Sequence, residues 1–280
     1  MSQDPGELTR QGMVVGGGRD QEERGVETVL PYARGQRLGG RTFQCDATAV
    51  RSRGGMRAFA LLDGIGDSEV VREWTRAQAR LLAEGGLRHG EAYSAVRALH
   101  AVCAYEAQQP GAPEVGAVAV LAVMVPGRPV TLAWCGDARA YLYEPDGEGP
   151  VLLTRDHNQR QRALDAGQYA PPGWRHSVTS ALGDLAPDPE IGEIALGQVD
   201  GGRLLLASDG AYEPVHDHSA EREWATALAA PTLVDAVRQL LDTTVWWTPE
   251  EADADNATVL VTDLPHLRTA RGGDRAGGGV

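Results

Sequence analysis

The stretch Phe59-Ala60-Leu61-Leu62-Asp63-Gly64-Ile65-Gly66 places a carboxylate directly after an unbroken apolar run. The stretch Leu204-Leu205-Leu206-Ala207-Ser208-Asp209-Gly210 repeats this arrangement far downstream. A carboxylate at the end of a buried strand is costly to remove from water unless it is paired or binds a cation. The two stretches therefore predict buried strands that end at a site with a reason to hold acidic side chains.

Three further acids have a similar placement. Asp137 follows the apolar run 132–136, Asp46 lies within a predicted apolar strand, and Asp255 directly precedes the last predicted strand. Five such acids indicate a shared site for hard divalent cations, which bind carboxylate, carbonyl and water oxygens. On the pattern alone, scattered turn and helix-cap roles account for the same acids equally well. The sequence lacks the CxxC and HExxH spacings that are typical of zinc sites.

Two other Asp-Gly steps have a different context. Asp146-Gly147 and Asp200-Gly201 each lie in a polar segment between two predicted strands. Aspartate and glycine are common in tight turns because both tolerate the backbone angles that turns require. We interpret these two steps as turns.

The hydrophobic periodicity alternates between strand and helix along the chain. Strands are predicted at 43–50, 57–62, 118–125, 130–134, 139–143, 151–154, 191–196, 203–207 and 257–264. A first helix is predicted at 68–84 and should end at Gly85-Gly86. Further helices are predicted from Ala92 to beyond Cys103, at 219–229 and at 232–242. A short helix and a loop are predicted within 158–183. Helices in pairs and strands in hairpins predict antiparallel sheets covered by helix pairs, an α+β layered domain.

Composition narrows the class of protein. The chain has 280 residues, 42% of them hydrophobic, and a formal net charge of −13 without any basic run. This balance excludes wholesale disorder and disfavours nucleic acid and anionic membranes as partners. All 26 basic residues are arginine, which excludes mechanisms that need a lysine.

The number of cysteines and the length of the apolar stretches indicate the compartment and exclude a membrane span. The three cysteines are widely spaced and odd in number, which is typical of a reducing compartment. The longest apolar stretch, 115–125, is shorter than the roughly 18 residues of a membrane span, and no secretory signal is recognisable. We expect a cytoplasmic protein without a membrane span, with flexible tails at 1–28 and 266–280 around one domain at 29–265.

The acidic stretches and their neighbours resemble the motifs of the metal-dependent protein phosphatases, the PPM or protein phosphatase 2C-like family, in its bacterial form. Eight short motifs occur in the family's order over about residues 37 to 264: 41–47 (RTFQCDA), 59–66 (FALLDGIG), 116–120 (GAVAV), 135–142 (CGDARAYL), 153–157 (LTRDH), 178–183 (VTSALG), 205–210 (LLASDG) and 255–259 (DNATV). Each motif alone is weak, whereas the ordered set is specific. The resemblance implies a β-sandwich of two antiparallel sheets flanked by antiparallel helix pairs.

The resemblance also implies roles for individual residues. Asp63 would bridge two Mn²⁺ or Mg²⁺ ions and act as a catalytic residue with Arg41, which would bind the substrate phosphate. The remaining implied ligands are the Gly64 carbonyl and Asp46 on the second ion, Asp209 and Asp255 on the first, and Asp137 with Asp209 on a looser third ion. The implied reaction is hydrolysis of phosphoserine and phosphothreonine monoesters in proteins by a metal-activated water.

Several positions depart from the family pattern. Cys45 replaces a Glu or Gln, Ile65 stands where some members carry a histidine, and Asp67 stands where a second glycine is expected. Ala117, Val118 and Ala138 replace residues with hydroxyl groups. For Asp67 we favour a cap on the helix that follows over an outer-sphere acid at the second cation.

Two functions are carried forward. The leading one is a cytoplasmic signalling enzyme, a monomer that acts on phosphorylated proteins opposite a cognate Ser/Thr kinase pathway. The alternative, which the departures motivate, is a catalytically weak or inactive pseudophosphatase that serves as a protein-binding regulatory module. Metal binding and turnover distinguish the two.

Overall fold

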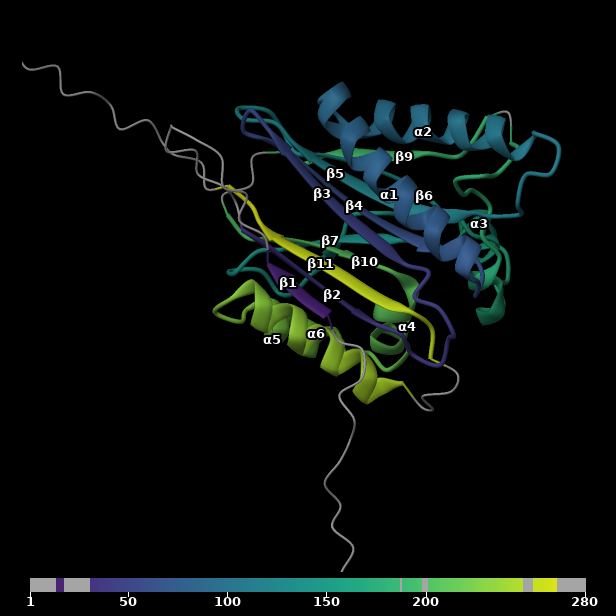
Figure 1. Ribbon diagram of the computed structural model, residues 1–280. Helices are drawn as coiled ribbons and strands as arrows, with labels where there is room; N and C mark the ends of the chain where they lie inside the picture. The colour runs from purple at the N-terminus through teal and green to yellow at the C-terminus, as the bar shows by residue number, and fades with distance from the viewer. Residues whose placement is uncertain (1–13, 18–30, 187, 198–200, 249–253, 266–280) are drawn as a thin grey trace, which may run out of the picture.

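The computed structural model describes residues 14–17, 31–186, 188–197, 201–248 and 254–265, whose strands form two antiparallel sheets (Figure 1). The six-stranded sheet has the order β1 (Val14–Gly17), β2 (Tyr32–Arg37), β11 (Ala257–Asp263), β10 (Arg203–Ala207), β7 (Arg139–Tyr143) and β8 (Val151–Leu152). The five-stranded sheet has the order β3 (Ala47–Arg53), β4 (Met56–Gly64), β5 (Ala117–Met124), β6 (Thr131–Cys135) and β9 (Gly192–Ala195).

Helices cover the outer faces of both sheets, as Figure 1 shows. The helices α1 (Glu69–His89) and α2 (Ala92–Ala107) lie over the five-stranded sheet. The helices α4 (Asp209–Asp217), α5 (Glu221–Leu228) and α6 (Leu233–Trp247) lie on the other side. The helix α3 (Gln159–Asp165) and the 3₁₀ helix η1 (Pro172–His176) belong to the connection between β8 and β9. None of the helices in these residues is long and apolar enough for a bilayer span.

Three apolar layers hold the molecule together. Leu82 and Leu121 lie in the layer between α1, α2 and the five-stranded sheet. Phe59 and Leu206 lie between the two sheets, and Trp224 lies between the six-stranded sheet and its helices. Burying each large side chain stabilises the fold by about 1.5–3 kcal/mol. The predicted α+β sandwich of two antiparallel sheets flanked by helix pairs is confirmed.

The predicted end of the first helix is wrong. Instead of ending at Gly85-Gly86, α1 continues to His89 and ends at Gly90 in the left-handed conformation, with φ of 68°. A Cβ atom on Gly86 would lie 2.9 Å from Ala58 Cβ and 2.9 Å from Val123 Cγ2. The glycine therefore lets the helix approach the sheet closely, and this packing offsets the roughly 1 kcal/mol that glycine costs inside a helix.

Other boundaries also differ from the sequence prediction. Residues 14–17, within the predicted N-terminal tail, form β1 and pair with β2. The remainder of that tail and the predicted tail at 266–280 lie outside the described residues. Asp46 precedes β3 instead of lying within it. The residues after Ser208 form helix α4, although Gly210 and Pro214 occupy positions that usually disfavour a helix.

Candidate metal centre

The first predicted ligand, Asp63, lies at the C-terminal end of β4 and is partly exposed. Its withdrawal from water and the charge of Asp209 raise the pKa of Asp63 well above its usual range. The backbone passes α1 so closely at Gly64 that a Cβ atom would lie 2.6 Å from the Cys45 carbonyl oxygen and 2.7 Å from Thr75 Oγ1. Only glycine fits this position, so the close packing fixes the backbone next to Asp63.

Asp209 brings a second Asp-Gly step to the same place from another element, the start of α4. A side-chain hydrogen bond joins Asp209 to Asp63, and withdrawal from water together with the charge of Asp255 raises the pKa of Asp209. A Cβ atom on Gly210 would lie 2.3 Å from the Asn256 carbonyl oxygen. Again a glycine permits a close backbone approach beside a carboxylate.

Asp46 is buried and provides the test of whether a cation fits the centre. Ser208 Oγ donates a hydrogen bond of 2.9 Å to Asp46 Oδ2, and Ser208 Oγ in turn accepts one from the Thr258 backbone N–H at 2.9 Å. Asp46 Oδ1 is buried and has no hydrogen-bond partner among the described residues. Burial raises the pKa of Asp46 to about 8, against the lowering effect of hydrogen bonds from Thr258 and Ser208. A buried carboxylate oxygen without a partner is costly, and a bound cation would remove that cost.

Asp137 lies in the turn after β6, and the backbone on both sides of it is anchored. The Gly136 N–H donates to His157 Nδ1 at 3.2 Å, and the His157 N–H donates to the Gly136 carbonyl oxygen at 3.0 Å. The Tyr212 hydroxyl donates to the Asp137 carbonyl oxygen at 2.9 Å. Burial, followed by the charge of Asp209, raises the pKa of Asp137 to about 7. His157 therefore serves structural hydrogen bonding beside Asp137.

Arg41 lies at the edge of this centre and is anchored from two sides. Its Nη2 lies 2.5 Å from Asp255 Oδ2, and the Arg41 side chain is 41% exposed. Asp67 accepts hydrogen bonds from the backbone N–H groups of Thr42 at 2.9 Å and Phe43 at 2.7 Å. Asp67 therefore fixes the segment that carries Arg41.

The cap prediction for Asp67 is wrong. Helix α1 begins after Ser68, whose hydroxyl accepts from the Val71 N–H at 3.3 Å. Ser68 is the residue with extended backbone angles that precedes the first helical turn, and such a residue is the one that caps a helix. The carboxylate of Asp67 is thereby free to bind the neighbouring chain segment, where its two hydrogen bonds to Thr42 and Phe43 lower its pKa.

All of the residues predicted to bind metal come together at one end of the sandwich. Asp63 experiences the charges of Asp209, Asp46 and Asp137. Asp46 experiences the charges of Asp209 and Asp255. Such a concentration of carboxylates is electrostatically unfavourable without cations. Oxygen donors of this kind suit Mg²⁺ and Mn²⁺ and are a poor match for softer metals.

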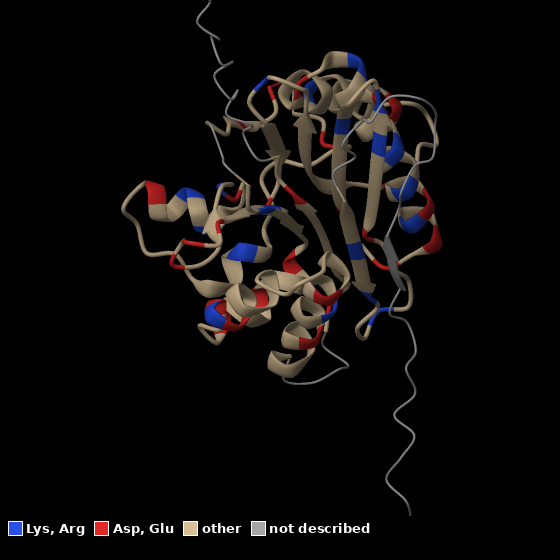
Figure 2. Cartoon of the chain, turned by 90° about the vertical axis from the view of Figure 1, so that its left-hand side faces the viewer, with Lys and Arg blue, Asp and Glu red and all other residues tan. Residues whose placement is uncertain are grey.

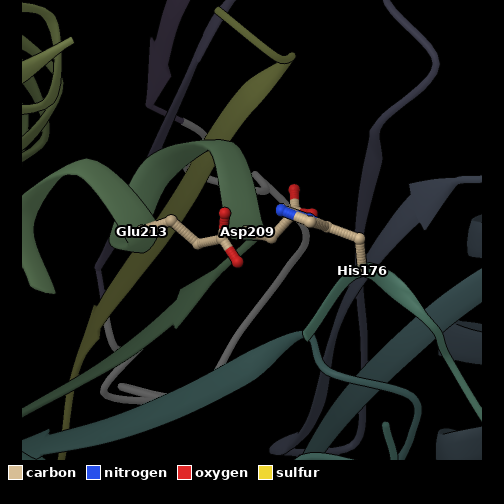
Figure 3. A group of neighbouring side chains, drawn as sticks. All are labelled: His176, Asp209 and Glu213. Carbon is tan, nitrogen blue, oxygen red and sulfur yellow. The ribbon is translucent and has the colours of Figure 1, made fainter. Parts of the chain in front are cut away.

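The structure adds two residues that the sequence reasoning missed. His176 from η1 and Glu213 from α4 join Asp209, and their ligand atoms all lie within 4.8 Å of one another (Figure 3). Withdrawal from water and the charge of Asp209 raise the pKa of Glu213 to about 8. Arg175 Nε lies 3.0 Å from Glu213 Oε1 and 3.4 Å from His176 Nε2, so a guanidinium already supplies positive charge here. The Asp209–Glu213 spacing of one helical turn was the available signal, but nothing local placed His176 beside it.

The departures from the family pattern leave the carboxylates in place. Cys45 is buried, its backbone N–H donates to Asn256 Oδ1 at 2.7 Å, and burial raises the pKa of its thiol. Ile65 is 50% exposed directly after the Asp63-Gly64 step. The thiol replaces the usual Glu or Gln as a small buried group, and Ile65 gives the entrance an apolar side chain.

Comparison with known proteins gives a consistent result. The family model described as "Protein phosphatase 2C" matches residues 74–163. The serine/threonine phosphatase of S. agalactiae has 19% sequence identity and a TM-score of 0.69, covering 85% of this chain and 100% of that one. The Mycobacterium tuberculosis phosphatase PstP/Ppp has 24% identity and a TM-score of 0.66, covering 85% and 99%. The PstP catalytic domain solved with two manganese ions has 25% identity and a TM-score of 0.63, covering 84% and 98%. No curated protein matches the sequence significantly.

Proposed function

We propose that this chain, a member of the protein phosphatase 2C-like (PPM) family of bacterial type, hydrolyses phosphoserine and phosphothreonine monoesters in proteins with the help of divalent cations. The observation that supports this most directly is the convergence of Asp46, Asp63, Asp137, Asp209 and Asp255 at one end of the sandwich, with Arg41 beside them. The proposal covers a single phosphatase domain at 29–265.

The ligand assignments are part of the proposal. Asp63 would hold both ions, the Gly64 carbonyl and Asp46 would hold the second, and Asp209 and Asp255 would hold the first. Asp137 with Asp209 would hold a looser third ion. The partnerless Oδ1 of Asp46 supports its role, and the partial exposure of Asp63, Asp209 and Asp255 leaves the centre open to a substrate.

The chemistry divides between the ions and the protein. A bound pair of Mn²⁺ or Mg²⁺ ions supplies an activated water and positive charge at the phosphorus. Arg41 holds the dianionic phosphate, since its planar fork can donate to two phosphate oxygens at once. Asp67 keeps the Arg41 segment in place through Thr42 and Phe43. No nucleophilic serine or cysteine is required.

The same proposal extends to the setting of the enzyme. We expect a cytoplasmic monomer that acts in signalling opposite a Ser/Thr kinase. The pseudophosphatase alternative has no structural support, because the departures at Cys45, Ile65 and Asp67 leave every proposed ligand present.

The test is phosphate release from a phosphothreonine peptide at pH 7 to 9, with Mn²⁺, with Mg²⁺ and with EDTA. We expect turnover with either ion and none with EDTA. The control variant Asp146→Asn removes a carboxylate that is exposed in a turn and is not a proposed ligand, so it should behave as wild type. A folded protein that binds Mn²⁺ but releases no phosphate under any of these conditions would favour the pseudophosphatase instead.

A further inference from the structure

One cavity among the described residues is lined by several basic side chains, and Arg41 is not among its lining residues. It has a volume of about 460 Å³ and lies between β2, the edge strand β3 and helix α1. At the right of Figure 2, basic residues lie on the strands, and the outer helix beside them carries both basic and acidic residues. Polar groups dominate the lining, which includes Tyr32, Gln36 and four arginines.

The four arginines come from three separate elements. Arg34 belongs to β2, Arg51 to β3, and Arg76 and Arg80 to α1. Their convergence is unusual for a chain whose net charge is −13, because acidic residues outnumber basic ones overall. Folding therefore concentrates positive charge in one concave place, and such a place attracts anions.

The guanidinium groups are only weakly neutralised by neighbouring acids. Arg51 Nε lies 3.4 Å from Glu84 Oε1, and Arg76 Nη1 lies 3.5 Å from Glu73 Oε1. Asp46 also lines the cavity; its Oδ2 accepts a hydrogen bond from Ser208, and its Oδ1 has no hydrogen-bond partner among the described residues. Arg34 Nη1 donates to the Thr48 carbonyl oxygen and hydroxyl, both at 3.1 Å, and these neutral acceptors leave its charge uncompensated.

Helix α1 contributes two exposed arginines, Arg76 and Arg80, to the cavity lining. Arg80 has no hydrogen-bond or ion-pair partner within the described ranges. Arg76 and Arg80 are four residues apart on α1, so their like charges lie on the same face and repel each other. An anion between them would convert this repulsion into two charge-assisted contacts.

We propose that this cavity binds a compact polyanion with at least two phosphate groups, an inorganic or a nucleoside diphosphate. Guanidinium groups suit phosphate because their planar fork can bind two oxygens at once. Four of them in one cavity of this volume exceed what a single orthophosphate needs. Gln36 lines the cavity and its Nε2 donates to the Asp46 carbonyl oxygen at 3.1 Å, so the cavity shares a wall with the metal centre.

The competing role for these arginines is protection of a sheet edge. β3 is an edge strand, and charged side chains on such strands prevent pairing with other chains. Edge protection requires charge on the edge strand β3 alone. It gives no reason for Arg76 and Arg80 on α1 to face the same space.

The test is calorimetric titration of the full chain with pyrophosphate in EDTA and about 0.15 M salt, where screening suppresses diffuse attraction. EDTA removes the cations, so the metal centre offers no cationic site for phosphate. We expect saturable binding of one pyrophosphate per chain, with orthophosphate at least tenfold weaker. An ADP arm separates the two sources, since tighter binding of ADP than of pyrophosphate would identify a nucleoside diphosphate.

The decisive variant is Arg76→Gln/Arg80→Gln, which should weaken pyrophosphate binding at least tenfold. Its matched control is Arg88→Gln/Arg97→Gln, which removes the same charge from α1 and α2 outside the cavity and should bind within twofold of wild type. The single variant Arg80→Gln disturbs no partner and should lose at least threefold if the double variant is unstable. Absence of saturable binding, or an equal loss in the control, would overturn the proposal and favour edge protection. Because binding is measured without metal or substrate, either result is independent of phosphatase activity.

Discussion

The Asp-Gly steps at 63–64 and 146–147 share a dipeptide but differ in almost every physical respect. Asp63 ends a buried strand among other carboxylates, and Gly64 tolerates no side chain. Asp146 is exposed in the turn between β7 and β8, where the Gly147 N–H donates to the Glu144 carbonyl oxygen at 2.9 Å. The residues that precede the dipeptide, and not the dipeptide itself, therefore distinguish the proposed metal ligand Asp63 from the turn residue Asp146.

Activity should show the largest difference between the two steps. Asp63→Asn keeps the side-chain size but removes an anionic oxygen from the proposed bridge between ions. We expect phosphopeptide turnover to fall at least 100-fold, equivalent to about 2.7 kcal/mol in the barrier. Asp146→Asn should remain within twofold. More than a tenth of wild-type turnover in Asp63→Asn would refute the bridging role.

Variants of the two Asp-Gly dipeptides should also differ in how much Mn²⁺ stabilises the folded protein. Saturation with Mn²⁺ at about 100 times its dissociation constant should stabilise the wild type by about 2.7 kcal/mol. For a domain of this size, that corresponds to roughly 5 to 11 °C in the melting temperature. Asp146→Asn should show the full shift upon Mn²⁺ addition, whereas Asp63→Asn should lose most of it. Equal shifts in thermal melts of both variants would contradict the assignment of the centre.

The variant Arg41→Ala tests whether a residue beside the proposed metal ligands also binds the substrate phosphate. Arg41→Ala should raise the Michaelis constant for a phosphothreonine peptide about tenfold, or about 1.4 kcal/mol, with a smaller change in turnover. The reason is that the ions remain while the phosphate loses its fork of donors. Steady-state kinetics distinguish this from the opposite outcome, a collapse of turnover at unchanged binding, which would place Arg41 mainly in the transition state.

The smallest effect should come from Asp67. Asp67→Asn retains one acceptor oxygen for the two N–H groups of Thr42 and Phe43, so one hydrogen bond is lost. We expect roughly a two- to fivefold rise in the Michaelis constant, with the Mn²⁺ activation constant unchanged. A tenfold rise in that activation constant would show that Asp67 acts on the cation. In the Arg41→Ala background the Asp67→Asn effect should disappear.

The sequence predicted most strands of the two sheets and most helices, and it singled out the five carboxylates, whose role as metal ligands stays a prediction. Long apolar runs such as 118–125 and 203–207 specify buried strands whatever surrounds them, and an acid at the end of such a run is stable only when it is paired or binds a cation. The strand β2, which pairs with β1 and β11, was missed because Gly35 and two arginines interrupt its apolar pattern. Asp200 of the other predicted turn lies outside the described residues.

The errors share a physical cause, which is tertiary packing that local signals do not contain. Gly85 and Gly86 predict a helix end, yet Gly86 lies against Ala58 and Val123 in the helix interior. The proximity of His176 to Glu213 depends on how the long connection between β8 and β9 folds back onto α4. The role of Asp67 depends on a chain segment 25 residues away, which no cap rule considers.

The hydrogen bonds that Asp67 accepts from Thr42 and Phe43 have a consequence for which substitutions are tolerated next to Arg41. Its carboxylate binds backbone amides, so the identities of the side chains at Thr42 and Phe43 are irrelevant to the anchor. Thr42 is exposed, beside the residue that we assign to the phosphate. Substitutions of Thr42 could change which peptide sequences bind, while the position of Arg41 stays the same. The Asp67 hydrogen bonds would thus let peptide selectivity evolve without a loss of phosphate binding by Arg41.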